Sequence, residues 1–175
     1  MEDALIVVTG FMGSGKSTVA RALALRLDSQ MVDLDEEILK QEGRSAKHLI
    51  EEQGEPAFRE IETRVLRDVL HNNAAGVIAL GGGAWTMPGN RDLIVSTGCK
   101  SVWLDAPFSL CWKRIVAGIL DGKDGRPLAR NEQEALTLYA ERRAAYASAD
   151  LHLEVTGYKT ADDLALEIVK ALLEC

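Results

Sequence analysis

A glycine-rich segment at 10–18 constrains the fold of this chain more than any other part of the sequence. It reads Gly-Phe-Met-Gly-Ser-Gly-Lys-Ser-Thr and fits the spacing G-x-x-x-x-G-K-[ST] of a Walker A loop. An apolar run at 4–8 precedes it, and a helical pattern at 19–27 follows it. This strand, loop and helix context predicts a binding site for the phosphates of a nucleoside triphosphate, rather than a glycine turn with a chance lysine.

The residue types of this loop suit a triphosphate. Glycines at 10, 13 and 15 let the backbone adopt positive φ angles and approach a ligand without interference from a Cβ atom. The N–H groups of the loop and of the following helix N-terminus can then converge on phosphate oxygens. Lys16 can reach the β- and γ-phosphates, and the hydroxyl of Ser17 can ligate Mg²⁺. We therefore expect a nucleotide and a magnesium ion in one site.

Strand and helix patterns alternate along the 175 residues. The expected strands are 4–9, 30–33, 77–80, 100–104 and 151–155. The expected helices are 16–27, about 35–41, 45–53, a helix from 55, 88–96, a helix from 107, 131–147 and a helix from 160. Alternation of this kind is typical of an α/β fold with a parallel sheet. The length predicts a single domain spanning 1–175.

The amino-acid composition limits which binding partners and which cellular compartment we expect for this protein. Lys and Arg number 20 against 27 acidic residues, a formal net charge of −7, which argues against nucleic acid or an anionic membrane as a partner. No apolar run approaches the length of a membrane span, and the first strand begins too early to leave room for a signal peptide. The cysteines at 99, 111 and 175 lack metal-like spacing, so we expect reduced thiols in the cytoplasm.

Two acids, Asp33 and Asp35, follow the second expected strand. Ligands of open parallel sheets bind beyond the carboxyl ends of strands, so both acids should lie near the phosphate loop. If the strand continues through them, both point to one face; one could hold a Mg²⁺-bound water while the other accepts a hydrogen bond from a substrate hydroxyl. Alternatively, acids at 35–37 favour the dipole of a following helix. Both interpretations can hold together.

Arg59 and a glycine triplet are further candidates. Arg59 stands three residues before Glu62 in an amphipathic helix, and the residues alone favour a surface ion pair over an arginine that orients a carboxylate. Gly81, Gly82 and Gly83 directly follow a buried-type strand. Three glycines are costly in chain entropy, so they favour a close approach to a ligand over a simple strand exit.

A basic, glycine-containing segment at 117–130 has the composition of a lid. Its closure would bring Arg126 onto the triphosphate and exclude water, although a solvated connection is the alternative. Arg142 and Arg143 lie late in the expected helix 131–147, four and three residues before Tyr146. Cations there also suit a helix C-terminus, so the residues alone leave their role open.

Taken together, these segments resemble the shikimate kinases. The matching segments are Gly10 to Thr18, Asp33-Leu-Asp35, Phe58-Arg59-x-x-Glu62, Gly81-Gly-Gly83, Arg126-Pro-Leu128 and Glu141-Arg142-x-x-x-Tyr146. The resemblance covers essentially the whole chain. It implies a three-layer P-loop NTPase fold of the nucleoside-monophosphate-kinase-like type: a five-stranded parallel sheet flanked by helices, a substrate-binding region at about 34–62 and a mobile lid at about 114–130. The stretch from Arg114 to Arg126 is longer than is usual in that family.

The resemblance also implies an activity and residue roles. The activity is ATP-dependent phosphorylation of the 3-hydroxyl of shikimate, on the route to chorismate and the aromatic amino acids. Separately from the resemblance, we expect a monomer. The implied ATP contacts are Gly13, Ser14, Gly15, Lys16, Ser17, Thr18 and Arg126. The implied magnesium ligands are Ser17 and Asp33. The implied shikimate contacts are Asp35, Arg59, Gly81, Gly82, Gly83 and Arg142, with Arg143 as a possible substitute for Arg142. The implied catalytic groups are Lys16, Asp35 and Arg126.

Two alternatives stay open at this stage. The first is a kinase for another small acceptor, such as gluconate or a nucleoside monophosphate; a carboxylic acid bearing hydroxyls suits Asp35 beside Arg59 better than a nucleotide does. The second is a nucleotide-dependent switch. GTPase switches usually carry an Asn-Lys-x-Asp element, and no asparagine of this chain is followed by lysine.

Overall fold

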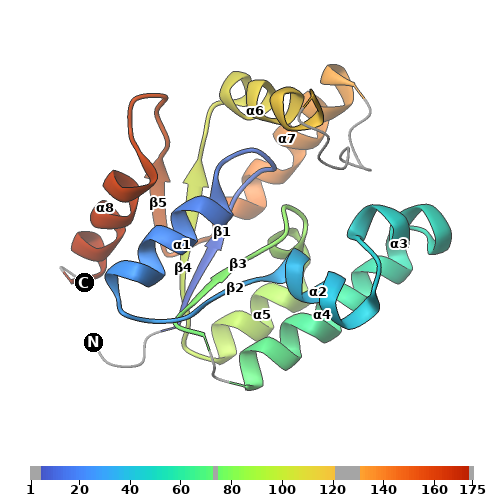
Figure 1. Cartoon of the computed structure of the whole chain (residues 1–175), viewed down its shortest axis with the longest axis horizontal. Helices are drawn as coiled ribbons and strands as arrows, with labels where there is room; N and C mark the ends of the chain where they lie inside the picture. Colours follow the sequence, from blue (N-terminus) through green and yellow to red (C-terminus); the bar gives the residue numbers. More distant parts are fainter. Residues whose placement is uncertain (1–4, 73–74, 121–130, 174–175) are drawn as a thin grey trace.

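A five-stranded parallel sheet forms the centre of the molecule (Figure 1). The computed structural model describes residues 5–72, 75–120 and 131–173. The strands are β1 (Ile6–Thr9), β2 (Met31–Asp33), β3 (Val77–Ala79), β4 (Lys100–Asp105) and β5 (Leu151–Glu154). Their order across the sheet is β2-β3-β1-β4-β5, and every pair is parallel. The expected parallel α/β fold is confirmed.

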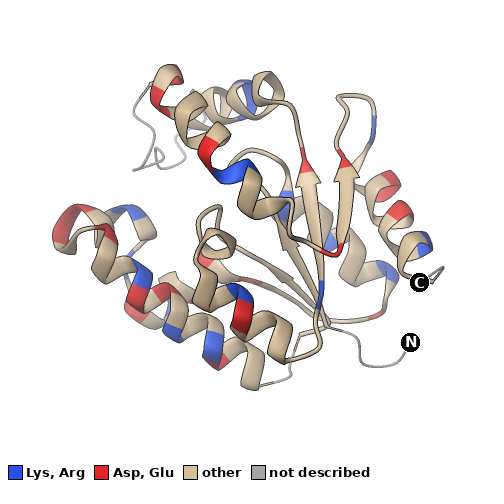
Figure 2. Ribbon diagram, turned by 180° about the vertical axis from the view of Figure 1, so that it is seen from behind, with Lys and Arg blue, Asp and Glu red and all other residues tan. Residues whose placement is uncertain are grey.

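Helices cover both faces of this sheet. They are α1 (Lys16–Arg26), α2 (Leu34–Glu42), α3 (Ala46–Gln53), α4 (Glu55–His71), α5 (Pro88–Ser96), α6 (Phe108–Leu120), α7 (Glu132–Tyr146) and α8 (Ala161–Leu173), with a short 3₁₀ helix η1 (Ala84–Thr86). Helices α1 and α8 lie in front of the sheet in Figure 1, and α5 and α7 lie in front of it in the opposite view of Figure 2. The central strand β1 is buried on both faces, as the helical layers require.

The starts of several helices were predictable from local sequence. The Ser45 side chain accepts a hydrogen bond from the N–H of His48 at the start of α3. Asn131 accepts one from the N–H of Glu134 at the start of α7, at 2.9 Å, and its amide donates back to the Glu134 carboxylate. These caps satisfy N–H groups that the first helical turn leaves without a partner. The two capped starts are confirmed.

One expectation about element boundaries is wrong. The chain does not become loop-like at 117, because α6 continues to Leu120 and Gly118 lies inside it. An apolar stripe along α6 outweighs the modest cost of one helical glycine. Strand β2 ends at Asp33, as expected, and Asp35 lies in the first turn of α2. Residues 121–130, with Arg126, lie outside the described residues. No helix within the described ranges is long and apolar enough to cross a bilayer.

Candidate functional site

The phosphate loop joins β1 to α1 at the carboxyl edge of the sheet. Its glycines at 10, 13 and 15 have φ angles of 143°, 78° and 99°, values that favour glycine. A Cβ atom on Gly13 would lie 2.6 Å from the carbonyl oxygen of Cys111, and one on Gly10 would lie 2.7 Å from that of Leu104. Both glycines are therefore required by neighbouring backbone in addition to any ligand.

Two N–H donors of the loop share one carbonyl oxygen within it. The ammonium of Lys16 donates to the carbonyl oxygen of Phe11 at 3.0 Å, and the N–H of Ser14 donates to the same oxygen at 3.1 Å. The Ser14 side chain is buried, and its hydroxyl has no hydrogen-bond partner within the described part of the chain. Lys16 is thus held against its own loop, at the start of α1.

Ser17 and Asp33 form a close pair of oxygen donors. The hydroxyl of Ser17 donates to Asp33 Oδ2 at 2.5 Å, while Asp33 Oδ1 accepts from the N–H of Asp35 at 3.0 Å. Asp33 therefore caps α2 and contacts Ser17 of the phosphate loop at once, while the expected acids at 35–37 lie in the first turn of α2. Hard oxygen donors of this kind are what Mg²⁺ prefers. Within the described residues, no cluster of three or more His, Cys, Asp or Glu side chains could hold a metal by itself.

Asp35 and Glu62 converge on Gly81, just beyond the end of β3. A Cβ atom on Gly81 would lie 2.8 Å from Asp35 Oδ1 and 3.0 Å from Glu62 Oε1. Burial raises the pKa of Glu62, the charge of Arg59 lowers it, and the charge of Asp35 raises it; the net shift is upward. Gly81 therefore makes room for two carboxylates in its immediate surroundings.

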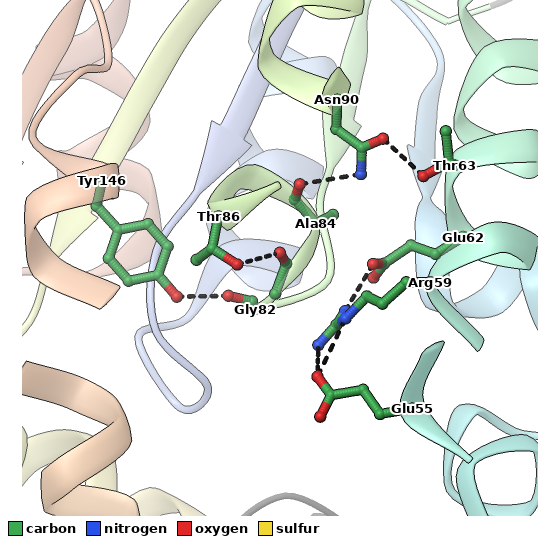
Figure 3. A network of polar contacts seen from close by, with 10 residues as sticks. Glu55, Arg59, Glu62, Thr63, Gly82, Ala84, Thr86, Asn90 and Tyr146 are labelled. Atoms are coloured by element: carbon green, nitrogen blue, oxygen red, sulfur yellow. Dashed lines mark hydrogen bonds and ion pairs between the residues drawn. The ribbon is translucent and has the colours of Figure 1, made fainter. Parts of the chain in front are cut away.

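Arg59 lies between two carboxylates of its own helix (Figure 3). Its Nη1 donates to Glu62 at 2.6 Å, and its Nε and Nη2 donate to one oxygen of Glu55 at 3.2 and 2.9 Å. The Glu62 side chain is 1% exposed and that of Arg59 is 11% exposed. Burial, the largest single cause, lowers the pKa of Arg59, but the charges of Glu62 and Glu55 and the hydrogen bonds to them together outweigh it, so the net shift is upward. The expected ion pair of Arg59 with Glu62 is present, but it is buried rather than at the surface.

The backbone of Gly82 and Gly83, which follows β3, passes close to Arg142 and Arg59. A Cβ atom on Gly82 would lie 3.5 Å from Arg142 Nη1, and one on Gly83 would lie 2.6 Å from Arg59 Cζ. The hydroxyl of Tyr146 donates to the Gly82 carbonyl at 2.5 Å (Figure 3). Burial raises the pKa of Tyr146 to about 12, so this hydroxyl keeps its proton at neutral pH.

Arg142 and Arg143 turn in different directions. The Arg142 side chain is largely buried and lines, with Arg59, a pocket of about 670 Å³ between α4 and η1. Arg143 instead forms an ion pair with Asp105, away from that pocket. The two arginines of the pocket come from helices far apart in the sequence, and the geometry favours Arg142 over Arg143 as the partner of Arg59.

A second pocket, of about 230 Å³, opens on the other side of the phosphate loop. Thr18, Lys159 and Arg114 contribute to its lining. Arg114 also donates to the carbonyl oxygens of Gly13 and Ser14, at 3.2 Å each. The sequence gives no local signal for these contacts of Arg114, because they span 100 positions or more. The pocket adjoins the loop where the rest of a nucleotide would extend from its phosphates.

The fold and the phosphate loop define a P-loop NTPase. A family model described as shikimate kinase matches residues 12–173. The chain is 40% identical over 172 residues to the shikimate kinase of Geobacter sulfurreducens, covering 97% of this chain and 91% of the relative, and 37% identical over 153 residues to that of Persephonella marina, covering 87% and 89%. The chain belongs to the shikimate kinase family.

Solved structures agree with this assignment. The shikimate kinase of Acinetobacter baumannii in complex with shikimate superimposes with a TM-score of 0.88 at 33% identity, covering 99% of this chain and 94% of that one. A gluconokinase from Sinorhizobium meliloti superimposes with a TM-score of 0.64 at 19% identity, over 98% and 94%. The second likeness concerns the fold alone, so it gives no support to the gluconate alternative.

Proposed function

We propose that this enzyme transfers the γ-phosphoryl group of ATP to the 3-hydroxyl of shikimate, a step in the synthesis of chorismate and the aromatic amino acids. The observation that carries the proposal is the pairing of Arg59 with Arg142 in one pocket, beside the turn at residues 81–83 that Asp35 and the N–H of Met12 in the phosphate loop also approach. A small acid with several hydroxyls matches this arrangement of two guanidiniums and a carboxylate. The family assignment and the shikimate complex of a relative support it.

The acceptor half of the site binds and orients shikimate in this proposal. Arg59 and Arg142 donate to its carboxylate, because a guanidinium matches a carboxylate with two parallel hydrogen bonds. Glu62 and Glu55 hold the Arg59 guanidinium in place before the substrate arrives. Asp35 accepts a hydrogen bond from the hydroxyl to be phosphorylated and aligns its oxygen with the γ-phosphorus. The loose transition state of phosphoryl transfer demands little more from a base. The backbone of residues 81–83 forms the remaining side of the shikimate site in this proposal.

The donor half is the phosphate loop. We assign the ATP phosphates to Gly13, Ser14, Gly15, Lys16, Ser17 and Thr18, with Lys16 moving from the Phe11 carbonyl onto the β- and γ-phosphates. Ser17 and Asp33 fit a magnesium ion through their adjacent oxygens. A bound Mg²⁺ would neutralise charge on the phosphate oxygens. Arg126, outside the described residues, remains the proposed lid contact to ATP.

The decisive test is a coupled ADP-release assay over a panel of acceptors. We expect turnover with shikimate and none above background with gluconate or AMP. Turnover with gluconate or AMP but not with shikimate would overturn the proposal. Equal ATP turnover with and without every acceptor would instead favour a nucleotide-dependent switch.

The remaining expectations about partners are also proposals. We propose a monomer of the cytoplasm without nucleic-acid or membrane partners. The net charge of −7 disfavours polyanions, and the buried, unpaired thiols of Cys99 and Cys111 suit a reducing compartment. Sedimentation equilibrium of the purified protein tests the monomer, and a dimer mass would overturn it.

Replacing Asp33 with asparagine should raise the Mg²⁺ concentration required for half-maximal activity by about tenfold, as a change near a bound metal typically does. The amide leaves one neutral oxygen where the carboxylate offered a charged one. A magnesium titration at saturating ATP and shikimate measures the change. Asp162→Asn, which alters an exposed acid on α8, is the matched control. An unchanged magnesium requirement in the Asp33 variant would contradict the assignment.

Gly83→Ala should raise the KM for shikimate by about tenfold or more, because even a small displacement of a substrate-binding group is costly. The KM for ATP should stay within twofold. The new methyl group would overlap the Arg59 guanidinium, which Glu55 and Glu62 hold in place. Gly89→Ala is the control, since a Cβ atom there meets nothing within 4 Å. Steady-state kinetics with each substrate varied in turn provides the test; equal KM values for shikimate in the two variants would refute the steric argument.

A further inference from the structure

A charged cluster joins α7 to the end of β4, on the sheet face that Figure 2 shows. The Arg143 guanidinium donates to both oxygens of Asp105, at 2.5 and 2.8 Å, in the two-pronged geometry that fixes orientation as well as distance. Its Cζ lies 5.0 Å from the ring centre of Trp103 and 5.5 Å from that of Tyr139. The Asp105 side chain is 13% exposed. Arg143 is therefore held by charge and by two aromatic rings.

Further contacts make this cluster rigid. The hydroxyl of Tyr139 donates to the Ala106 carbonyl at 3.0 Å and accepts from Arg143 at 2.8 Å. A ring nitrogen of His152 lies 2.9 Å from Asp105 Oδ2, and the His152 ring stacks on Trp103. The cluster thus fixes one side of α7 to the carboxyl edges of β4 and β5.

The same helix carries groups of the acceptor site on a different side. Arg142 precedes Arg143 by one position, and successive side chains on an α-helix point about 100° apart. Arg142 lines the pocket with Arg59, and Tyr146 holds the Gly82 carbonyl. A rotation of α7 about its axis would move Arg142 away from Arg59. The Asp105–Arg143 pair opposes this rotation, because its geometry is satisfied at one helix orientation.

We propose that Asp105 and Arg143 are positioning residues for shikimate: by fixing the rotation of α7, they aim Arg142 at the substrate carboxylate. This inference rests on the proposed carboxylate-binding role of Arg142. It gives a function to Arg143, which sequence reasoning had treated as an alternative to Arg142. Arg143 acts through its neighbour and does not touch the substrate.

The test compares kinetic constants of full-length variants. Asp105→Asn should raise the KM for shikimate by about tenfold, with the KM for ATP within twofold, since displacement of a binding group by a distant change costs this much or more. Arg143→Lys, which keeps the charge and can keep one hydrogen bond to Asp105, should raise it by only about threefold. Arg26→Gln, at an exposed ion pair between α1 and α8, is the control and should change neither constant.

A double-mutant cycle separates positioning from general stability. If Asp105 acts through Arg142, Asp105→Asn should have little further effect on the KM for shikimate in an Arg142→Lys background. The inference would be overturned if the fold-change in the KM for shikimate of the double variant equalled the product of the two single-variant fold-changes. It would also be overturned if Asp105→Asn lowered the melting temperature but left the KM for shikimate unchanged. If Asp105→Asn does not fold, Arg143→Lys carries the same cycle. An unchanged KM in Arg142→Lys alone would reject the proposed role of Arg142, and this inference with it.

Discussion

Lys16→Ala should lower kcat for shikimate phosphorylation by about 10²- to 10³-fold, the loss seen when one preorganised donor to a developing charge is removed. The ammonium neutralises charge that builds on the oxygens of the transferring phosphoryl group. Its position at the start of α1, next to the loop that Gly13 and Gly15 shape, lets it move onto a phosphate chain by leaving the Phe11 carbonyl. Stopped-time assays of shikimate 3-phosphate at saturating substrates measure kcat directly.

Calorimetry should show that the Lys16 variant still binds shikimate with an affinity within about threefold of the parent, because the acceptor pocket is formed by other helices. Lys170→Ala, at an exposed position on α8, controls for the general loss of a positive charge and should keep full activity. A Lys16 variant with near-normal kcat would refute the assignment of the phosphate loop as the catalytic donor site.

The features that sequence reasoning predicted correctly depend on residues close together in the chain. The phosphate loop needs a fixed spacing of glycines, and the structure gives Gly10, Gly13 and Gly15 positive φ angles. The caps at Ser45 and Asn131 involve N–H groups three residues away. The parallel sheet follows from the alternation of strands and helices, which requires crossover connections.

The features that sequence reasoning missed depend on burial and on distant partners. The sequence pattern of an Arg59 and Glu62 pair at i, i+3 is the same whether the pair is exposed to solvent or buried under a loop. The pair is buried because the backbone of Gly83 packs on Arg59. Arg143 pairs with Asp105 across 38 positions, so no local pattern predicts this contact. The extent of α6 past Gly118 reflects the same limit, because tertiary packing overrides the weak local preference of one glycine.

Arg59→Ala should raise the KM for shikimate by about hundredfold and leave ATP binding intact. Truncating one partner of a buried charged pair costs about 2–5 kcal/mol in binding, much of it from the charge left behind. In the free enzyme the charge left behind is Glu62, whose side chain is 1% exposed. The same change should therefore also lower the free energy of unfolding by about 3 kcal/mol.

The two effects of this substitution separate in the variant Arg59→Ala with Glu62→Gln. The neutral amide removes the unpaired buried charge, so stability should recover by most of the loss, while the KM for shikimate should stay high because the guanidinium is still missing. Arg21→Ala, an exposed arginine on α1, serves as the control for both readouts. Normal shikimate binding by the Arg59 variant in calorimetry would show that the acid is held elsewhere. Recovery of the KM along with stability would show that Arg59 acts on the fold rather than on the substrate.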